Sequence, residues 1–236
     1  MASLEQLQMR KAAAKTQLVK NGTDTPVAIR IRNKAGKAVT SVAVTTGTSL
    51  VLTDSVGATT STFATDSTVA KVLATVNGSA DWEAKALDIL LSDVTTDNIF
   101  VTNAGITAQQ DGNGNTYYDV LVSTAVSLEI AACVSPFRDF DAPKGHRVVI
   151  KNIKYGVNMG TAAVDSAQLY KRKDGVETKV FGELSVDTTE TTVMDYLSSP
   201  DGFYGDSDTE YIFRVKDAAT LSDATTNYVR VIANIE

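Results

Sequence analysis

The sequence is poor in the residues that build most catalytic and metal sites. Its 236 residues include one cysteine, one histidine, one tryptophan and four prolines, and aromatic residues make up 7%. A single cysteine excludes an internal disulfide, and a single histidine excludes metal sites built from several histidines. No run of about 18 apolar residues occurs, so we expect no membrane-spanning helix. The N-terminus lacks a basic segment followed by an apolar one, so we expect no signal peptide.

The composition that remains favours a folded, β-rich protein. Hydrophobic residues make up 43% and charged residues 21%, which is enough apolar material for a core. The 30 threonines and the many valines fit a pleated sheet better than a helix. We therefore expect a mainly β chain beyond residue 25, with one helical interruption.

The first 25 residues are predicted to form a basic helical arm. The pattern predicts a helix over residues 3–20, capped by Ser3 and ended by Asn21 and Gly22. Residues 1–34 contain seven basic and two acidic residues, a charge of +5 on a chain whose net charge is −6. We expect this arm to dock on a protein partner. The candidate docking residues are Arg10, Lys11, Lys15, Lys20, Arg30 and Arg32. No aromatic residue accompanies them, so the pattern does not favour nucleic acid.

Residues 26–134 are predicted to form a β domain with two short helices inserted at about 66–91. One face of the first helix carries Val69, Val72, Leu73 and Val76, and Asp66 or Ser67 caps it. The second helix is predicted to start at Ser79 and to place Trp82 in the core. Strands are expected at 27–32, 39–45, 49–53, 59–63, 98–102, 117–123 and 127–134.

Residues 135–145 are predicted to link this domain to a second β domain. The linker contains Pro136 and Pro143 and has little periodicity. Residues 146–236 carry short strands separated by turn signals, which is typical of an antiparallel β-sandwich or jelly roll. These strands are expected at 147–151, 153–157, 168–173, 177–183, 190–195, 210–215 and 228–235.

No motif in the sequence indicates an enzyme or a cofactor, and the acidic residues at 206–210 are interpreted as a solvated loop, with a loosely held calcium ion as the alternative. His146 has no nucleophile elbow to pair with, and Cys133 lies in an apolar run. The alternation of Asp111, Asn113 and Asn115 resembles part of a calcium loop. It lacks the glycine and the bidentate glutamate of such a loop, so we expect a hairpin turn there. We therefore predict a non-enzymatic protein.

One loop in the second domain is a candidate ligand site. It combines two aromatic residues with carboxylates, a combination that suits a sugar face or a packed hydrophobic plug. Its residues are Phe203, Tyr204, Asp206 and Asp208.

Three features resemble virion structural proteins of tailed bacteriophages. In residues 65–84, a helix ending at Asn77-Gly78 is followed by Trp82, an arrangement that resembles a stretch of such proteins. The C-terminal β block is similar to the sandwich or jelly-roll modules of capsid decoration and tail proteins. The basic arm without a leader is the third feature. The resemblance covers residues 40–91 best, implies a structural role in the virion, and transfers no catalytic or binding residue.

The sequence therefore predicts a capsid decoration protein, assembled in the host cytoplasm, whose arm bridges neighbouring shell subunits. Its expected partners are other virion proteins, the major capsid protein first, and further copies of itself, with a trimer favoured. The alternatives are a tail or neck component, and a carbohydrate-binding or adhesin module on a β-sandwich. Deleting residues 1–25 is expected to leave a folded β body and to abolish docking.

Overall fold

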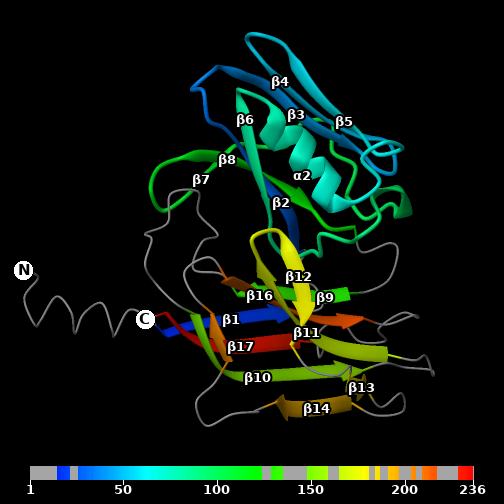
Figure 1. The fold of residues 1–236 in the computed structure, drawn as a ribbon, viewed down its shortest axis with the longest axis vertical. Coiled ribbons are helices and arrows are strands. Elements are labelled where there is room, and N and C mark those ends of the chain that lie inside the picture. Colours follow the sequence, from blue (N-terminus) through cyan, green and yellow to red (C-terminus); the bar gives the residue numbers. More distant parts are fainter. Residues whose placement is uncertain are drawn as a thin grey trace, which may run out of the picture. The chain divides into compact units, whose positions relative to one another are not determined.

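The computed structural model describes residues 26–123 in full, and side chains also at 168–180 and 209–214. Of the remaining chain it describes the backbone of strands within residues 15–21, 129–134, 148–158, 165–167, 184–186, 191–196, 203–205, 215–216 and 228–235. This part of the chain consists mainly of antiparallel strands and has one α-helix (Figure 1). The expectation of a mainly β protein is confirmed.

The described strands belong to two compact units, which we call the inserted unit and the terminal unit. The inserted unit lies between Thr25 and Val126. The terminal unit contains β1 (Lys15–Asn21) and all strands from β9 (Glu129–Val134) onward. The sequence pattern groups β9 with the first domain, whereas in the structure β9 pairs along six residues with β16 (Thr209–Lys216). The inserted unit therefore interrupts the terminal unit between β1 and β9.

Two sheets build the inserted unit. The first has the strand order β6-β2-β8-β7, and the second is the meander β3-β4-β5. Their strands are β2 (Val27–Asn33), β3 (Val39–Thr45), β4 (Ser49–Asp54), β5 (Ala58–Thr62), β6 (Trp82–Ala86), β7 (Gln109–Gln110) and β8 (Thr116–Leu121). The strands predicted at 27–32, 39–45, 49–53, 59–63 and 117–123 are confirmed to within a few residues.

The helical region differs from the prediction in its second half. Helix α2 (Val69–Gly78) is present and buries Val69, Val72 and Val76, as the spacing predicts. Its N-cap is Thr68, without a side-chain cap hydrogen bond, instead of Asp66 or Ser67. The second predicted helix is wrong, because residues 82–86 form strand β6, which pairs with β2. A strand satisfies its backbone through a neighbour, and β2 supplies that neighbour here.

The predicted strand at 98–102 is also wrong. A short 3₁₀-helix, η1 (Thr95–Asp97), precedes it, and Phe100 forms only an isolated bridge with Val122. Phe100 nevertheless lies in the core, with its ring centroid 5.3 Å from that of Phe63. The Val101 N–H donates to the Leu121 carbonyl at 3.0 Å and the Ser123 N–H to the Ile99 carbonyl at 2.7 Å, so two backbone bonds and the packing of Phe100 hold the segment without an extended ladder.

One core joins both sheets of the inserted unit and helix α2. It includes Ile29 and Ile31 from β2, Leu50 and Leu52 from β4, and Trp82. Trp82 is 1% exposed, so the prediction that it is a core residue is confirmed, although it lies on a strand. Burying aromatic and branched side chains is the main stabilising contribution to such a unit.

The Asp111 loop is the hairpin turn that the sequence predicts. It connects β7 with β8, and the Asp111 carboxylate accepts hydrogen bonds from the backbone N–H groups of Asn113 and Asn115. An aspartate that bonds the backbone ahead of it in this way stabilises a turn without a cation.

The terminal unit also contains two antiparallel sheets. One has the order β1-β17-β10-β14 with β15 beside β10, and the other has the order β12-β11-β16-β9 with β13 beside β11. Contacts of β9 with β1 and β17 bring the two sheets together. The remaining strands are β10 (Val148–Asn158), β11 (Asp165–Lys173), β12 (Val176–Lys179), β13 (Leu184–Val186), β14 (Thr191–Tyr196), β15 (Phe203–Gly205) and β17 (Tyr228–Ile235).

Two local predictions in the terminal unit can be compared with its strands. The two strands predicted at 147–151 and 153–157 are one strand, β10, whose pairing with β17 shifts register between Ile150 and Asn152. The turn predicted at Asp174 and Gly175 is confirmed, since both residues have positive φ (51° and 75°) between β11 and β12. This conformation is the one that a two-residue hairpin needs.

The predicted N-terminal helix is wrong over residues 15–20. These residues form β1, which pairs antiparallel with β17 from Lys15↔Asn234 to Asn21↔Tyr228. Residues 3–14 of the predicted helix and residues 135–145 of the predicted linker lie outside the described residues. Within the described part of the chain, no helix is both long enough and apolar enough to span a membrane.

Candidate interaction surface

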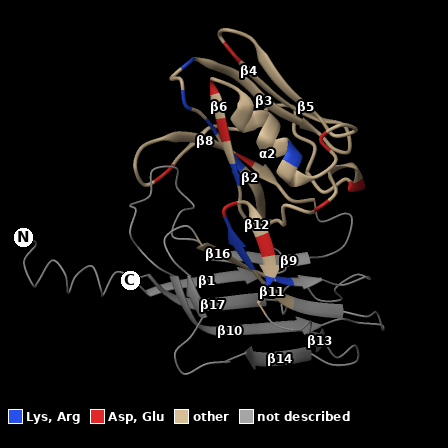
Figure 2. Cartoon of the chain, viewed as in Figure 1, with Lys and Arg blue, Asp and Glu red and all other residues tan. Residues whose placement is uncertain are grey.

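The outer face of the β3-β4-β5 sheet carries no charged side chain, and we call it the neutral face. Alternation along the strands and the register between them place nine residues on it, in three rows across the sheet. Figure 2 shows these strands almost free of charged residues. The rows are Ser41-Thr53-Ala58, Ala43-Val51-Thr60 and Thr45-Ser49-Thr62.

The opposite face of the same sheet fixes the position of the neutral face. Val42, Val44, Leu50 and Leu52 point into the core and are at most 1% exposed. A face held by a packed core is rigid, so its side chains lose little freedom when a partner binds. Interface centres are depleted of charged residues, and the neutral face has this property on a chain that is 21% charged.

Asp54 ends β4 and organises the turn that leads into β5. Its carboxylate accepts hydrogen bonds from the N–H groups of Val56 (2.8 Å) and Gly57 (3.2 Å) and from the Asn33 amide (3.0 Å). These bonds, the one from Val56 first, outweigh the desolvation of the carboxylate and lower the pKa of Asp54 below its ordinary value of 3.8. The charged form of Asp54 therefore stabilises the turn.

The turn makes stability depend on pH. Because the pKa of Asp54 is lowered in the folded state, its contribution is present above pH 3.8 and is lost as the pH falls through the folded pKa. Asp54→Asn should remove this component, so that its free energy of unfolding falls less than that of the wild type below pH 3.8. Urea unfolding at several pH values measures the difference. Asp97→Asn, a substitution at an exposed aspartate, controls for the loss of one carboxylate. If Asp54→Asn loses as much stability as the wild type when the pH falls below 3.8, the expectation is wrong.

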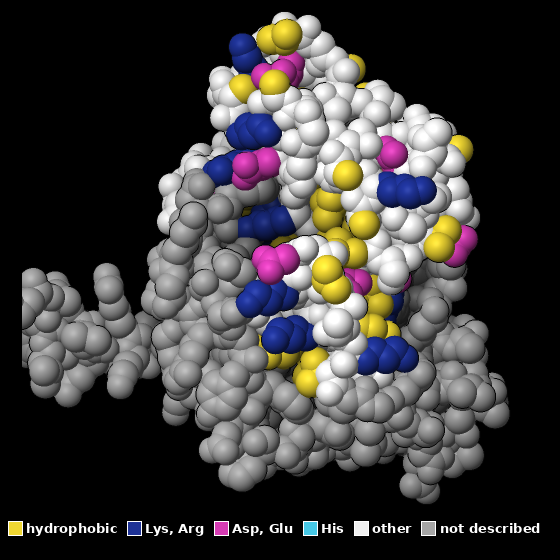
Figure 3. Space-filling view, in the orientation of Figure 1, with side chains coloured by type: hydrophobic (Ala, Val, Ile, Leu, Met, Phe, Trp, Pro, Cys, Tyr) yellow, Lys and Arg dark blue, Asp and Glu magenta, His cyan; other side chains and the backbone are white. Residues whose placement is uncertain are grey.

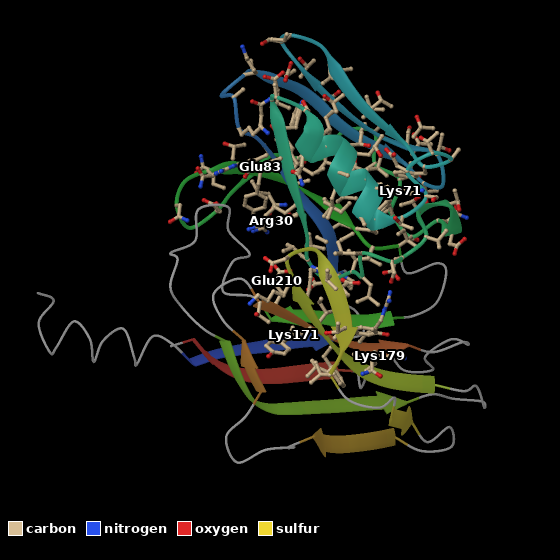
Figure 4. The ribbon with its side chains drawn as sticks, in the orientation of Figure 1. Arg30, Lys71, Glu83, Lys171, Lys179 and Glu210 are labelled. Atoms are coloured by element: carbon tan, nitrogen blue, oxygen red, sulfur yellow. The ribbon has the colours of Figure 1, made fainter. Side chains whose placement is uncertain are left out.

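Arg30, a predicted docking residue, is buried in the first sheet of the inserted unit. Its side chain is 9% exposed, and Nε and Nη2 donate to the two carboxylate oxygens of Asp119 at 2.8 and 2.9 Å. Figure 4 labels Arg30 within the inserted unit. Its guanidinium carbon lies 3.7 Å from the centroid of the Tyr117 ring. Arg30 therefore holds β2 to β8 and presents no charge for docking, which corrects the sequence-based assignment.

Arg32 is also paired within the inserted unit. Its Nε lies 2.7 Å from Glu83 Oε1, across the register between β2 and β6. Figure 3 shows basic and acidic side chains lying beside one another on the visible described surface. The basic docking charge predicted for residues 1–34 is thus reduced by two internally neutralised arginines.

The other predicted docking residues lie in or before β1. Arg10 and Lys11 lie outside the described residues. Lys15 and Lys20 belong to β1, of which the backbone alone is described, and they pair with Asn234 and Val229. The structure therefore leaves their proposed docking role a prediction.

The candidate ligand loop is partly a strand. Phe203 and Tyr204 belong to β15, whose backbone pairs with Ile150 and Val149 of β10. Asp206 and Asp208 lie outside the described residues. A ligand role for these four residues stays a prediction.

Three of the described charges of the terminal unit form a cross-strand row. Arg172 on β11 lies between Glu177 on β12 and Glu210 on β16, with a nitrogen 2.9 Å from an oxygen of each carboxylate. The Arg172 side chain is 7% exposed, so this row joins three strands and offers no open charge. Across the residues that the structure describes, no three His, Cys, Asp or Glu side chains come together as a metal site.

A signal in the sequence could have identified the neutral face. Residues 38–65 contain one charged residue, Asp54, and Asp54 is buried. A stretch of this length with a single charge is compatible with a fully buried segment or with an uncharged surface, and the alternation of apolar residues along its strands favours the uncharged surface.

The neutral face is the candidate site within the described residues, and docking through Arg10, Lys11, Lys15 and Lys20 stays a prediction. No protein-family model matches the sequence, and no curated protein matches it significantly.

Proposed function

We propose that the protein is a non-enzymatic structural protein of a virion, and that it binds an assembled capsid shell as a decoration protein. The observation that carries the proposal is the neutral face, a rigid and uncharged surface on the inserted unit. The expected partner is the major capsid protein. The terminal unit, with two five-stranded antiparallel sheets, is proposed to form a β-sandwich or jelly roll.

The chemistry of the neutral face suits a protein partner. Serine and threonine hydroxyls satisfy hydrogen bonds in either direction, while Ala43 and Val51 give the middle row apolar area. Binding such a surface costs no desolvation of charge, so modest apolar contact is enough to favour association. Further copies of the protein, as a trimer on quasi-threefold positions of the shell, fit the same proposal.

Placing a lysine in the middle row tests the proposal. We expect Ala43→Lys to weaken binding to empty shells of the same phage's major capsid protein by about tenfold or more, because the ammonium group must be desolvated. Co-sedimentation of shells with increasing protein measures the affinity. The control is Ala70→Lys, the same substitution at an exposed position of α2.

The control separates the face from the added charge. Equal loss in Ala43→Lys and Ala70→Lys would show that charge alone weakens binding, and would contradict the role of the neutral face. Absence of wild-type binding to shells, with binding to purified tails, would assign the protein to the tail or neck instead.

A further inference from the structure

Edge strands of the inserted unit expose backbone groups that other chains can pair with, and two of these edges are covered. On β6, the Asn77 side chain accepts from the Ala84 N–H at 2.7 Å and donates to the Ala84 carbonyl at 3.0 Å. On β3, Val44 exchanges hydrogen bonds with Asn103 at 2.8 and 2.9 Å. Natural proteins block edges in such ways because open edges invite pairing between chains.

Among the residues that the structure describes, none gives the β5 edge a comparable cover. The ladder between β4 and β5 is closed at its ends by bonds between Asp54 and Gly57 and between Thr48 and Phe63. Antiparallel pairs alternate between bonded and non-bonded, so Thr59 and Ser61 also bond to β4.

The other residues of β5 point their backbone groups away from β4. By the same alternation, the N–H and C=O groups of Ala58 and Thr60 and the N–H of Thr62 face the open edge. Among the described residues, no strand or loop pairs with this edge. The three side chains are exposed. The edge therefore offers a free hydrogen-bonding ladder.

β5 also lacks the usual protection of an edge strand. Its residues Ala58–Thr62 contain no lysine, no other charge and no proline, and its pairing with β4 runs without a bulge. Val56, which is 67% exposed, lies just before the strand and adds apolar area to this end of the sheet.

We propose that two copies of this chain associate through antiparallel pairing of their β5 strands about a two-fold axis at Thr60. Thr60 of one copy pairs with Thr60 of the second copy, and Ala58 pairs with Thr62. In this register the two Thr60 residues can exchange both of their outward backbone bonds, and the Thr62 N–H can donate to the Ala58 carbonyl. The Thr62 carbonyl already accepts from the N–H groups of Thr65 and Asp66. The two-fold axis makes each contact occur twice. Two three-stranded sheets become one six-stranded sheet.

A second copy is the occupant because the edge is uncharged. A two-fold contact places the residue at the axis opposite its own copy, so a charge there would face a like charge. The chain has a net charge of −6, yet β5 carries none. The pairing leaves the neutral face open, and the inference does not depend on shell binding.

Because a five-residue edge contact is small, we expect a monomer–dimer equilibrium in place of an obligate dimer. Sedimentation equilibrium of the full chain, from about 1 µM to 1 mM, should show association that grows with concentration. Thr60→Pro removes an outward N–H without breaking the β4 ladder, and should lower the association constant about tenfold or more. Thr60→Lys should do the same by adding a like charge at the axis.

Thr45→Lys is the matched control, because it adds the same charge to the neutral face on the strand farthest from the edge. It should change the association constant less than about twofold. A wild type that stays monomeric throughout would overturn the proposal. So would self-association that Thr60→Pro and Thr60→Lys leave unchanged, including a trimer formed elsewhere on the chain.

A cross-link tests the register itself. The two-fold places both Thr60 Cα atoms about 5.5 Å apart, a separation that a disulfide spans. Thr60→Cys should therefore form disulfide dimers under copper-catalysed oxidation much faster than Thr45→Cys, with the native Cys133 present in both. Equal rates would contradict the register. If Ala43→Lys loses shell binding and Thr60→Pro retains it, shell binding does not require the β5 dimer, and the two proposals can be tested independently.

Discussion

Replacing Asp119 with alanine is expected to lower the free energy of unfolding of the inserted unit by about 3–5 kcal/mol. The substitution leaves the Arg30 guanidinium in a buried position without the carboxylate that binds it through two nitrogens. A buried charge that loses its counter-ion is destabilised, because the desolvation of the charge is no longer offset by the attraction to that counter-ion. Urea unfolding followed by the fluorescence of Trp82, the single tryptophan and a core residue of this unit, measures the loss.

A second ion pair on the same strand provides the control. Glu83 pairs with Arg32 across β2 and β6, but its side chain is 29% exposed, so Glu83→Ala should cost about 1 kcal/mol or less. The double variant Arg30→Met and Asp119→Ala should recover much of the stability, because it removes both charges. If Asp119→Ala lowers the free energy of unfolding no more than Glu83→Ala does, burial does not increase the contribution of the Arg30–Asp119 pair to stability.

The strands of the inserted unit were predictable because their hydrophobic alternation is local. Along β4, Leu50 and Leu52 are buried while Ser49, Val51 and Thr53 face outward, which is the period that a half-buried strand requires. Turn residues at 46–48 and 55–57 separate the strands on either side. Each element could be placed from its own residues.

Strand β6 shows where that local information is ambiguous. Trp82 and Ala86 are four residues apart, which fits a helical face, but Trp82, Ala84 and Ala86 also alternate as in a strand. Pairing with β2, which lies about 50 residues earlier in the sequence, stabilises the strand conformation of β6 over a helix. A short segment adopts the structure that its partner allows, and the partner is not visible in the segment.

Strand β1 and the candidate site depend on even more distant partners. The alanine run near residue 13 favours a helix locally, yet Lys15–Asn21 pairs with a strand that ends at residue 235. Arg30 was assigned to docking because positive charge can be counted in a sequence, whereas its partner Asp119 is 89 residues away. The neutral face likewise requires the register of three strands before its rows across the sheet can be named.

Deleting residues 1–21 is expected to unfold or strongly destabilise the terminal unit and to leave the inserted unit folded. The deletion removes all seven residue pairs between β1 and β17, so that β17 becomes an open edge that exposes its N–H and C=O groups. We expect the melting temperature of the terminal unit to fall by about 10 °C or more, with aggregation on heating. Far-UV circular dichroism should record the loss of strand, while the emission of Trp82 stays that of a buried indole.

Deleting residues 1–14 is the matched control, because it keeps β1, and it should leave both units folded. A synthetic peptide of residues 15–21 should raise the melting temperature of the protein that lacks residues 1–21. A scrambled peptide should not, because pairing with β17 depends on the sequence of β1. If both deletions melt alike, β1 contributes little to the terminal unit. If the deletion of residues 1–21 unfolds the terminal unit and the deletion of residues 1–14 does not, a loss of docking after deleting residues 1–25 would result from the damaged sheet. Such a loss would then not be evidence for a docking arm. The shorter deletion, which still removes Arg10 and Lys11, is then the variant that tests whether basic residues before β1 bind a partner.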